Sequence, residues 1–367
     1  RLPSPAIRVE QGDRVLITLE NGHTMPHTLH LHGSDHPFRD ASGEGNDGVP
    51  IASEMPVMPG QARTYELQPR NAGTKFYHCH VQPQVHVHMG LQGLFIIEEN
   101  RPENWVQTLN VGAGHVRAPS VGVRERYDRE YDLHYSDVDA ELNQRIQQHN
   151  DVRRVAASLH RDYDATDASS DYFALNGASF PYTFRESLVV VRPDERIKLR
   201  VVNGARTPMG LHTHGHTMTI THRDGIAAAP GTQITRDVVA LATAQRLDLE
   251  LATANDGHGA FGPGIWLFHD HGNKAITSDG IGPGGHISAI VYEDHLDDRG
   301  WPLTQGVDWE PYFTAAYYQR QLPVWERYAP GLFSDVGPDH ALAIRWILMA
   351  VFLALALVSA WRLGTRG

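Results

Sequence analysis

Histidine is the residue type that sets this sequence apart. The chain has 367 residues, of which 23 are histidines and one is a cysteine. Two histidines stand two positions apart six times, whereas random placement would give roughly 1.4 such pairs. Because residues i and i+2 of a β-strand point to the same face, each pair presents two imidazoles in one direction. Imidazole is the commonest metal ligand in proteins, so the pairs predict metal sites.

Four of these pairs recur at equivalent places in two halves of the chain. His30 comes nine residues after Asn21, at which a strand-like segment ends, and His212 comes nine residues after Asn203, which ends a similar segment. A second pair follows an aromatic or apolar segment in each half. Such a repeat indicates two related domains. The four pairs are His30 and His32, His78 and His80, His212 and His214, and His269 and His271.

The ligand types favour copper. Eight convergent imidazoles suit copper better than magnesium, calcium or manganese, which prefer oxygen ligands. Eight ligands also exceed what one mononuclear site can use, so we expect more than one metal ion.

The first half contains a further set of metal ligands. His27, Cys79 and His86 lie beside or within its histidine pairs. Two imidazoles and one thiolate are the trigonal ligands of a blue electron-transfer copper, whose weak axial neighbour tunes the reduction potential. In the second half, Met209 and Asp270 stand at the positions of His27 and Cys79. Only the first half is therefore expected to hold a blue copper.

The elements that position these residues are predicted to be β-strands. Short segments with alternating apolar and polar residues, bounded by turn residues, run through both halves, which is typical of β-sandwiches. The segment between the halves is polar and contains one predicted helix, Ala140 to His160, with apolar residues on one face. We predict an all-β fold divided into a first sandwich (1–100), a linker (101–169), a second sandwich (170–297), an irregular tail (298–340) and a membrane anchor (341–363).

The anchor prediction comes from one apolar run. Residues 347–360 are uncharged, and with the residues in front they reach the roughly 20 that a bilayer core requires. Arg362 and Arg366 follow the run. By the positive-inside rule, the short C-terminus is expected in the cytoplasm and the copper domains on the extracytoplasmic side.

Composition excludes several other classes of protein. The 32 basic and 43 acidic residues give a net charge of −11, which argues against a nucleic-acid binder with its basic stripe. One cysteine excludes an internal disulfide framework and any zinc or iron–sulfur site built from several cysteines.

At these residues the chain resembles a known family. HTLHLHG, followed by FYHCH and Gly90-Leu91, is similar to the copper signatures of the multicopper oxidases. Residues 1–100 and 170–297 resemble cupredoxin domains, which implies Greek-key β-sandwiches. A blue copper in the first of only two such domains resembles the two-domain, laccase-like members.

The resemblance implies four copper ions per chain. The type 1 copper would have His27, Cys79 and His86 as ligands, with Leu91 as an axial neighbour that does not bind. The type 2 copper would be bound by His30 and His212. Asp47 resembles the acidic residue that this family uses as a proton donor. The type 3 pair would be bound by His32, His78, His80, His214, His269 and His271.

One spacing departs from the family pattern. Six residues separate Cys79 from His86, where three or four are usual in the family. His86 is preferred to His88 because Gly90-Leu91 then falls at the family's Gly-Met or Gly-Leu position. Met89 remains a competing axial ligand, since a thioether is the usual weak axial donor.

The predicted function is an oxidase. Electrons from a reducing substrate would enter through the edge of His86 and pass from Cys79 to the neighbouring histidines. There dioxygen would be reduced to water. Each domain supplies half of the trinuclear ligands, so the resemblance implies a homotrimer in which halves of neighbouring subunits meet. A phenol-like compound, a metal ion and a protein donor all stay open as reductants.

Two other functions would use part of this ligand set. A copper nitrite reductase is also a trimer of two-domain subunits, but it needs only a mononuclear catalytic copper with about three histidines. A copper-binding electron carrier would explain the blue site but not eight further ligands. The four complete pairs favour dioxygen reduction over both.

Overall fold

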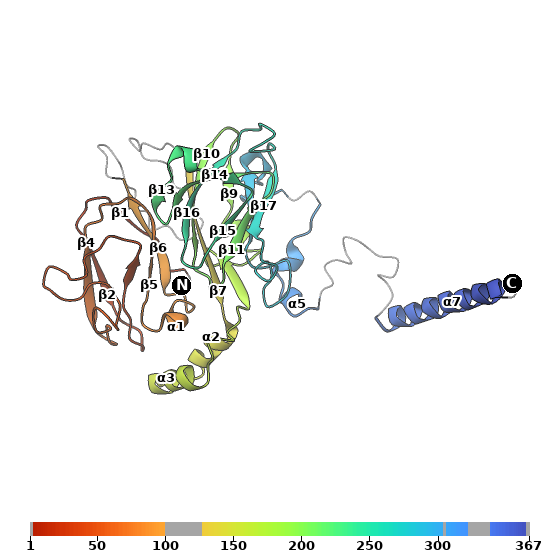
Figure 1. Ribbon diagram of the computed structural model, residues 1–367, viewed down its shortest axis with the longest axis horizontal. Coiled ribbons are helices and arrows are strands. Elements are labelled where there is room, and N and C mark those ends of the chain that lie inside the picture. The colour runs from red at the N-terminus through yellow and green to blue at the C-terminus, as the bar shows by residue number, and fades with distance from the viewer. Residues whose placement is uncertain (1–2, 100–126, 304–305, 322–337, 365–367) are drawn as a thin grey trace. The chain divides into compact units, whose positions relative to one another are not determined.

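The computed structural model describes residues 3–99, 127–303, 306–321 and 338–364. It divides into two compact units, Arg1–Val307 and Asp308–Gly367. Both histidine-rich halves lie in the first unit. As predicted, this unit is built mainly of β-sheet, in two sandwiches (Figure 1).

The first sandwich consists of a four-stranded and a two-stranded sheet. The strand order in the larger sheet is β1 (Ile7–Glu10), β6 (Gln92–Glu98), β5 (Gly73–His78) and β3 (His30–His32), while β2 (Val15–Glu20) pairs with β4 (Ala62–Leu67). Alternate residues of β2 point inward, as the period of a half-buried strand requires. They pack on a core shared by both sheets, which includes Leu31, Tyr65 and Phe95.

The second sandwich is larger. Its main sheet runs β13 (Ile226–Ala227), β12 (Met218–Arg223), β16 (Arg246–Ala252), β10 (Arg196–Asn203), β7 (Arg129–Val138) and β8 (Tyr172–Leu175), with β14 (Ile234–Arg236) on β12. The facing sheet runs β15 (Val238–Leu241), β11 (Met209–Thr213), β17 (Ile265–Asp270), β18 (Ile287–Tyr292) and β9 (Val189–Val191). Leu199, Leu211 and Leu249 are among the buried residues between the two sheets.

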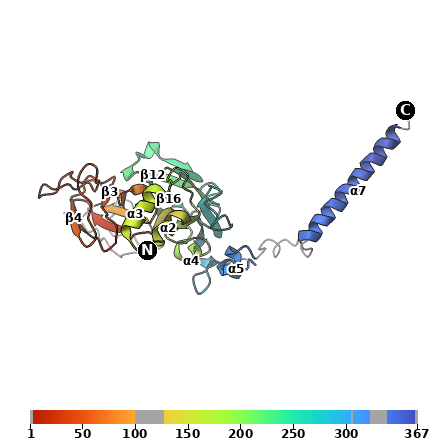
Figure 2. The ribbon, with the colours of Figure 1, turned by 90° about the horizontal axis from the view of Figure 1, so that it is seen from below.

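The predicted linker contributes both a strand and helices. Strand β7 pairs in parallel with β10, so part of 101–169 belongs to the main sheet of the second sandwich. The single helix predicted over 140–160 is wrong, since the chain forms α2 (Ala140–Gln147) and α3 (Val152–Arg161) (Figure 2). The Asp151 side chain accepts a hydrogen bond from the backbone N–H of Arg153 and caps a new helix there.

The remaining helices are short, except at the C-terminus. They are α1 (Pro83–His86), α4 (Thr183–Glu186), α5 (Ala315–Tyr318) and the 3-10 helices η1 (Pro230–Thr232), η2 (Glu293–His295) and η3 (Glu310–Phe313). The last helix is α7 (Pro338–Gly364). Within the described ranges, no helix is long and apolar enough to cross a membrane. The anchor predicted at 341–363 therefore finds no support in the structure.

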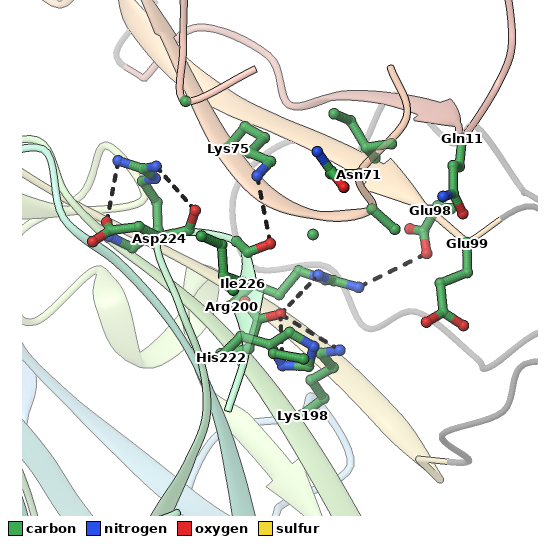
Figure 3. A pocket seen from close by; sticks show the side chains of 18 of the residues that line it. Gln11, Asn71, Lys75, Glu98, Glu99, Lys198, Arg200, His222, Asp224 and Ile226 are labelled. Carbon is green, nitrogen blue, oxygen red and sulfur yellow. Dashed lines mark hydrogen bonds and ion pairs between the residues drawn. The ribbon is translucent and has the colours of Figure 1, made fainter. Parts of the chain in front are cut away.

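Buried ion pairs join the two sandwiches. Arg8 of β1 donates to Glu130 of β7 at 3.0 Å. Arg200 of β10 forms an ion pair with Glu98 of β6 at 3.8 Å, and both side chains line a cavity of about 630 Å³ (Figure 3). Within the second sandwich, Arg200 also donates to Glu130 at 2.8 Å and to Asp248 at 3.2 Å. Removing one partner of such a buried pair typically costs about 3–5 kcal/mol, so this junction holds the sandwiches in a defined arrangement.

Candidate metal centre

The histidines of the first half gather at one edge of the first sandwich. Strands β3 and β5 pair antiparallel with His30 opposite His78. One nitrogen each of His30, His32 and His78 lie within 4.8 Å of one another. The ring of His80 lies 5.4 Å from that of His30, centroid to centroid. The strand register therefore brings all four predicted imidazoles together.

The second half repeats this arrangement. Strands β11 and β17 pair antiparallel with His212 opposite His269. One nitrogen each of His212, His214 and His269 lie within 4.8 Å of one another, and the Nε2 atoms of His214 and His269 are 3.3 Å apart. The ring centroids of His271 and His212 are 5.4 Å apart.

Backbone carbonyls orient several of these rings. His30 Nδ1 lies 2.7 Å from the carbonyl of Asp47, and His78 Nδ1 lies 3.0 Å from that of Cys79. His212 and His269 make the same kind of contact, at 3.1 and 2.9 Å. A hydrogen bond from Nδ1–H to a carbonyl leaves Nε2 as the nitrogen that can bind a metal. The donor set therefore fits a copper cluster.

The third group surrounds the cysteine. Cys79 Sγ lies 3.6 Å from His27 Nδ1 and 3.3 Å from His86 Nδ1. All three side chains are buried, with 4, 6 and 0% exposure for Cys79, His27 and His86. The short helix α1 turns the chain back so that His86 reaches the sulfur. His86 Nε2 is buried without a hydrogen-bond partner in the described residues. One thiol and two imidazoles without competing charges fit the predicted type 1 ligands.

Burial also keeps these ligands in a form that can bind metal. Burial, together with the neighbouring histidines, lowers the pKa of His27 to about 4 and that of His86 to about 3. Burial likewise lowers the pKa of His32 and His78 to about 4. Neutral imidazoles offer a lone pair at ordinary pH. Burial raises the pKa of the Cys79 thiol, so metal binding there would release a proton.

The alternative ligands lie in different surroundings. His88 Nδ1 is 3.2 Å from Asp137 Oδ1, and Arg206 Nε is 3.4 Å from His88 Nε2. His88 is therefore held by polar partners outside the Cys79 group. Met89 packs against the core of α2 and α3 and also lines a cavity that reaches Cys79. Leu91 is tied to Cys79 by a backbone hydrogen bond of 3.0 Å.

Asp47 lies beside the first group of histidines. Its Oδ1 is 3.4 Å from His30 Nδ1 and 2.9 Å from His36 Nε2. A carboxylate next to one ligand and held by another imidazole can orient that ligand or hold a proton near it.

Two histidines that contact the predicted site residues were not predicted from the sequence. His36 contacts Asp47, and the Nδ1 of His23 lies 2.9 Å from His27 Nε2. Both residues lie in loops, so no strand period connects them to the site. Their one signal was proximity in sequence, since His23 precedes His27 by four residues and His36 follows His32 by four.

The two half-sites belong to different sandwiches. Among the described residues, no cluster of three metal-ligating side chains combines histidines from both halves. Each sandwich therefore holds its own group of four paired histidines.

Several known proteins are similar to this chain. Two family models described as "Multicopper oxidase" match residues 1–102 and 153–279. The iron transport multicopper oxidase FET3 of Saccharomyces cerevisiae is 27% identical over 347 residues, which cover 94% of this chain. The chain spans less than half of that relative, 46% of its length.

Solved structures of multicopper oxidases are similar to this fold. A multicopper oxidase called mgLAC aligns with a TM-score of 0.63 at 25% identity, covering 86% of this chain and 84% of its own. The blue copper oxidase from Nitrosomonas europaea aligns with a TM-score of 0.62 at 26% identity, covering 87% and 85%.

Proposed function

The chain belongs to the multicopper oxidase family, and on that basis we propose that it couples one-electron oxidation of a reducing substrate to the four-electron reduction of dioxygen to water. One observation carries this proposal. The Cys79 sulfur lies in the His27–His86 group, while the residues on either side of it, His78 and His80, belong to the other histidine cluster. A few covalent bonds therefore join an electron-entry site to a second metal site.

Copper at these ligands would supply one-electron transfer and dioxygen binding. We propose one type 1 ion held by His27, Cys79 and His86. The other three ions would be held by the two sets of four paired histidines, with His30 and His212 on the type 2 ion. Eight imidazoles exceed the needs of a nitrite reductase, so dioxygen is the favoured acceptor.

Protons must also reach the oxygen that is reduced. We assign this role to Asp47, whose carboxylate lies 2.9 Å from His36 Nε2 and 3.4 Å from His30 Nδ1. His36 would hold the carboxylate in place, because its Nε2 lies closer to Asp47 Oδ1 than the His30 Nδ1 does. This arrangement puts an exchangeable proton beside a proposed ligand.

The incomplete half-sites support a homotrimer. We propose that the first-sandwich half of one subunit meets the second-sandwich half of the next, in a head-to-tail contact that closes into a ring. Light scattering should then give three times the mass of the chain for the copper-loaded protein. The membrane anchor at 341–363 and the extracytoplasmic location stay predictions.

Copper content tests the proposal. We expect four copper ions per chain, half of them silent in EPR, together with oxygen uptake when a reductant is added. Two ions per chain, both visible in EPR, would contradict the oxidase and make nitrite the first substrate to test.

A further inference from the structure

The cavity between the two sandwiches contains a buried ammonium group. Lys75 of β5 lines this cavity of about 630 Å³, and only 3% of the residue is exposed. Among the described residues, its Nζ has one hydrogen-bond acceptor, the carbonyl of Gly225 at 3.4 Å (Figure 3), and forms no ion pair. Burying a charge that is not paired is costly, so this ammonium group needs a further partner.

Three carboxylates that line the cavity have another cation as their partner. Arg200 forms an ion pair with each of them, at 3.8 Å with Glu98, 2.8 Å with Glu130 and 3.2 Å with Asp248. These acidic groups therefore do not supply the missing partner of Lys75.

A second cation, Arg246 of β16, lies beside Lys75. A Cβ added at Gly33 would touch both the Arg246 guanidinium and the Lys75 side chain, so the two side chains approach the same point of the cavity wall. Asp224 Oδ1 lies 3.3 Å from Arg246 Nη1. The Nε of Arg246 is buried without a hydrogen-bond partner in the described residues. The two cations and the one carboxylate leave one excess positive charge.

The surroundings of both cations agree with this count. The pKa of Lys75 is lowered, first by burial and then by the Arg246 guanidinium, which together outweigh the surrounding carboxylates. Burial likewise lowers the pKa of Arg246. A bound anion would favour the charged form of both groups.

The cavity opens to solvent and has room for an organic molecule. Asn71 and Ile226 line it and are both exposed, so they mark its mouth. Ile226 and Ala227 also supply apolar surface beside the charged groups. Ligand pockets of this volume typically hold small organic molecules, which favours an organic anion over a halide ion.

We propose that the part of the cavity between Lys75 and Arg246 binds one small organic carboxylate with a single negative charge. The carboxylate accepts hydrogen bonds from Lys75 Nζ and from the Arg246 guanidinium, and its carbon chain lies toward Ile226. Such a ligand connects β5 of the first sandwich with β16 of the second. None of these residues is a proposed copper ligand, so the test of this site is independent of the test of the oxidase.

The charge of the ligand is tested with two compounds of the same shape. Isothermal titration calorimetry on the copper-loaded full chain compares butyrate with the uncharged butyramide. We expect butyrate to bind once per chain, butyramide not to bind, and chloride to bind at least about tenfold more weakly than butyrate. Equal binding of butyrate and butyramide, no binding of butyrate, or chloride binding as tight as that of butyrate would overturn the proposal.

Two lysine variants test where the carboxylate binds. Lys75→Met keeps a long side chain but removes the ammonium group, and Lys274→Met makes the same change at an exposed site outside the described cavity lining. We expect Lys75→Met to weaken butyrate binding at least about tenfold and Lys274→Met to leave it unchanged. Equal binding by the two variants would mean that butyrate binds elsewhere, copper included, and would overturn the site.

Two isoleucine variants give the same test if Lys75→Met does not fold. Ile226 and Ile234 are both exposed, at 71 and 41%, and Ile234 does not belong to the described cavity lining. Ile226→Glu places a competing carboxylate at the mouth of the cavity and should weaken butyrate binding about tenfold, whereas Ile234→Glu should not. The same butyrate affinity in both variants would contradict binding between Lys75 and Arg246.

Discussion

The two sandwiches use equivalent backbone positions in different ways. His30 pairs with His78 as His212 pairs with His269, so Cys79 corresponds to Asp270. Gln92 pairs with His78, and Ile287 with His269. The residues just before them, Leu91 and His286, are therefore equivalent as well. Where the first sandwich has a thiol and an apolar neighbour, the second has a carboxylate and an imidazole.

In the second sandwich these positions stabilise the fold. Asp270 Oδ2 lies 3.5 Å from His286 Nδ1, and Asp270 Oδ1 accepts from the backbone N–H of Gly210 and Gly272 at 3.1 and 3.0 Å. Burial alone would raise the pKa of Asp270, but His286 and the Gly272 N–H outweigh it and lower this pKa. Protein groups thus contact both oxygens of this carboxylate.

In the first sandwich the same place remains available for a ligand. Cys79 contacts two neutral imidazoles, and Leu91 contributes no polar atom. Equivalent backbone positions thus carry the proposed metal site in the first sandwich and the contact between Asp270 and His286 in the second.

The largest expected effect comes from the cysteine. Cys79→Ser should abolish the blue absorption and lower oxygen uptake by more than about 100-fold, beyond what loss of a supporting residue costs. The reason is that serine offers no thiolate to copper. Absorption spectra and oxygen-electrode rates measure both changes.

The matched control is Met209→Leu, at the second-sandwich position equivalent to His27. This volume-conserving change in the core should cost under about 1.5 kcal/mol and keep the blue absorption. A Cys79→Ser protein that keeps the blue absorption would contradict the proposed difference between the Cys79 and Asp270 positions.

The next effect concerns stability. Asp270→Asn should lower the free energy of unfolding by about 2–3 kcal/mol. The uncharged asparagine is a weaker hydrogen-bond partner than the carboxylate for buried His286 and for two backbone N–H groups. Urea denaturation measures the loss. The blue absorption should not change.

The control for this variant is Asp13→Asn, at an exposed turn, with an expected change within about 0.5 kcal/mol. Equal stability of both variants would mean that the Asp270 carboxylate does not stabilise the fold.

Much of this comparison was predictable from sequence because it depends on strand periodicity. Residues i and i+2 share a face, so His30 with His32 and His212 with His214 pointed to ligand pairs before any fold was known. The all-β architecture and its two sandwiches were predicted on the same basis.

Other features depend on tertiary contacts and could not be predicted. The cover over His86 arises where α2 and α3, residues 140–161, pack on α1 more than fifty residues earlier. The break between these helices left one signal in the sequence, the step of six positions from Ile146 to Val152, which a helical spacing of three or four does not fit. His23 lies in a loop and contacts His27. A loop has no regular spacing of residues from which this contact could be predicted.

A smaller effect is expected at the axial position. Leu91→Met should lower the reduction potential of the blue copper by roughly 60 mV, the equivalent of a tenfold change in a one-electron equilibrium, because a thioether is the usual weak axial donor. Redox titration of the blue absorption measures it. Met89→Leu is the control and should leave the potential unchanged. A shift in Met89→Leu alone would make Met89 the axial ligand.

The smallest effect concerns a buried histidine between the two sandwiches, in contrast to the buried histidines that we propose as metal ligands. Burial lowers the pKa of His134 to about 3, as low as that of His86. Yet His134 has a protein partner, since its Nε2 lies 3.1 Å from Gln92 Oε1 of the first sandwich. Below the ordinary pKa of 6.5, His134 binds a proton in the unfolded chain but stays neutral in the folded chain. Acid therefore destabilises the fold.

Between pH 7 and pH 6 this group alone should cost about 0.7 kcal/mol. Urea denaturation at both values should therefore show a smaller pH dependence for His134→Gln than for the unmodified chain, because groups common to both cancel. An identical pH dependence would mean that His134 titrates normally in the fold. In that event the imidazole would be hydrated, and its contact with Gln92 would not help to hold the first sandwich to the second.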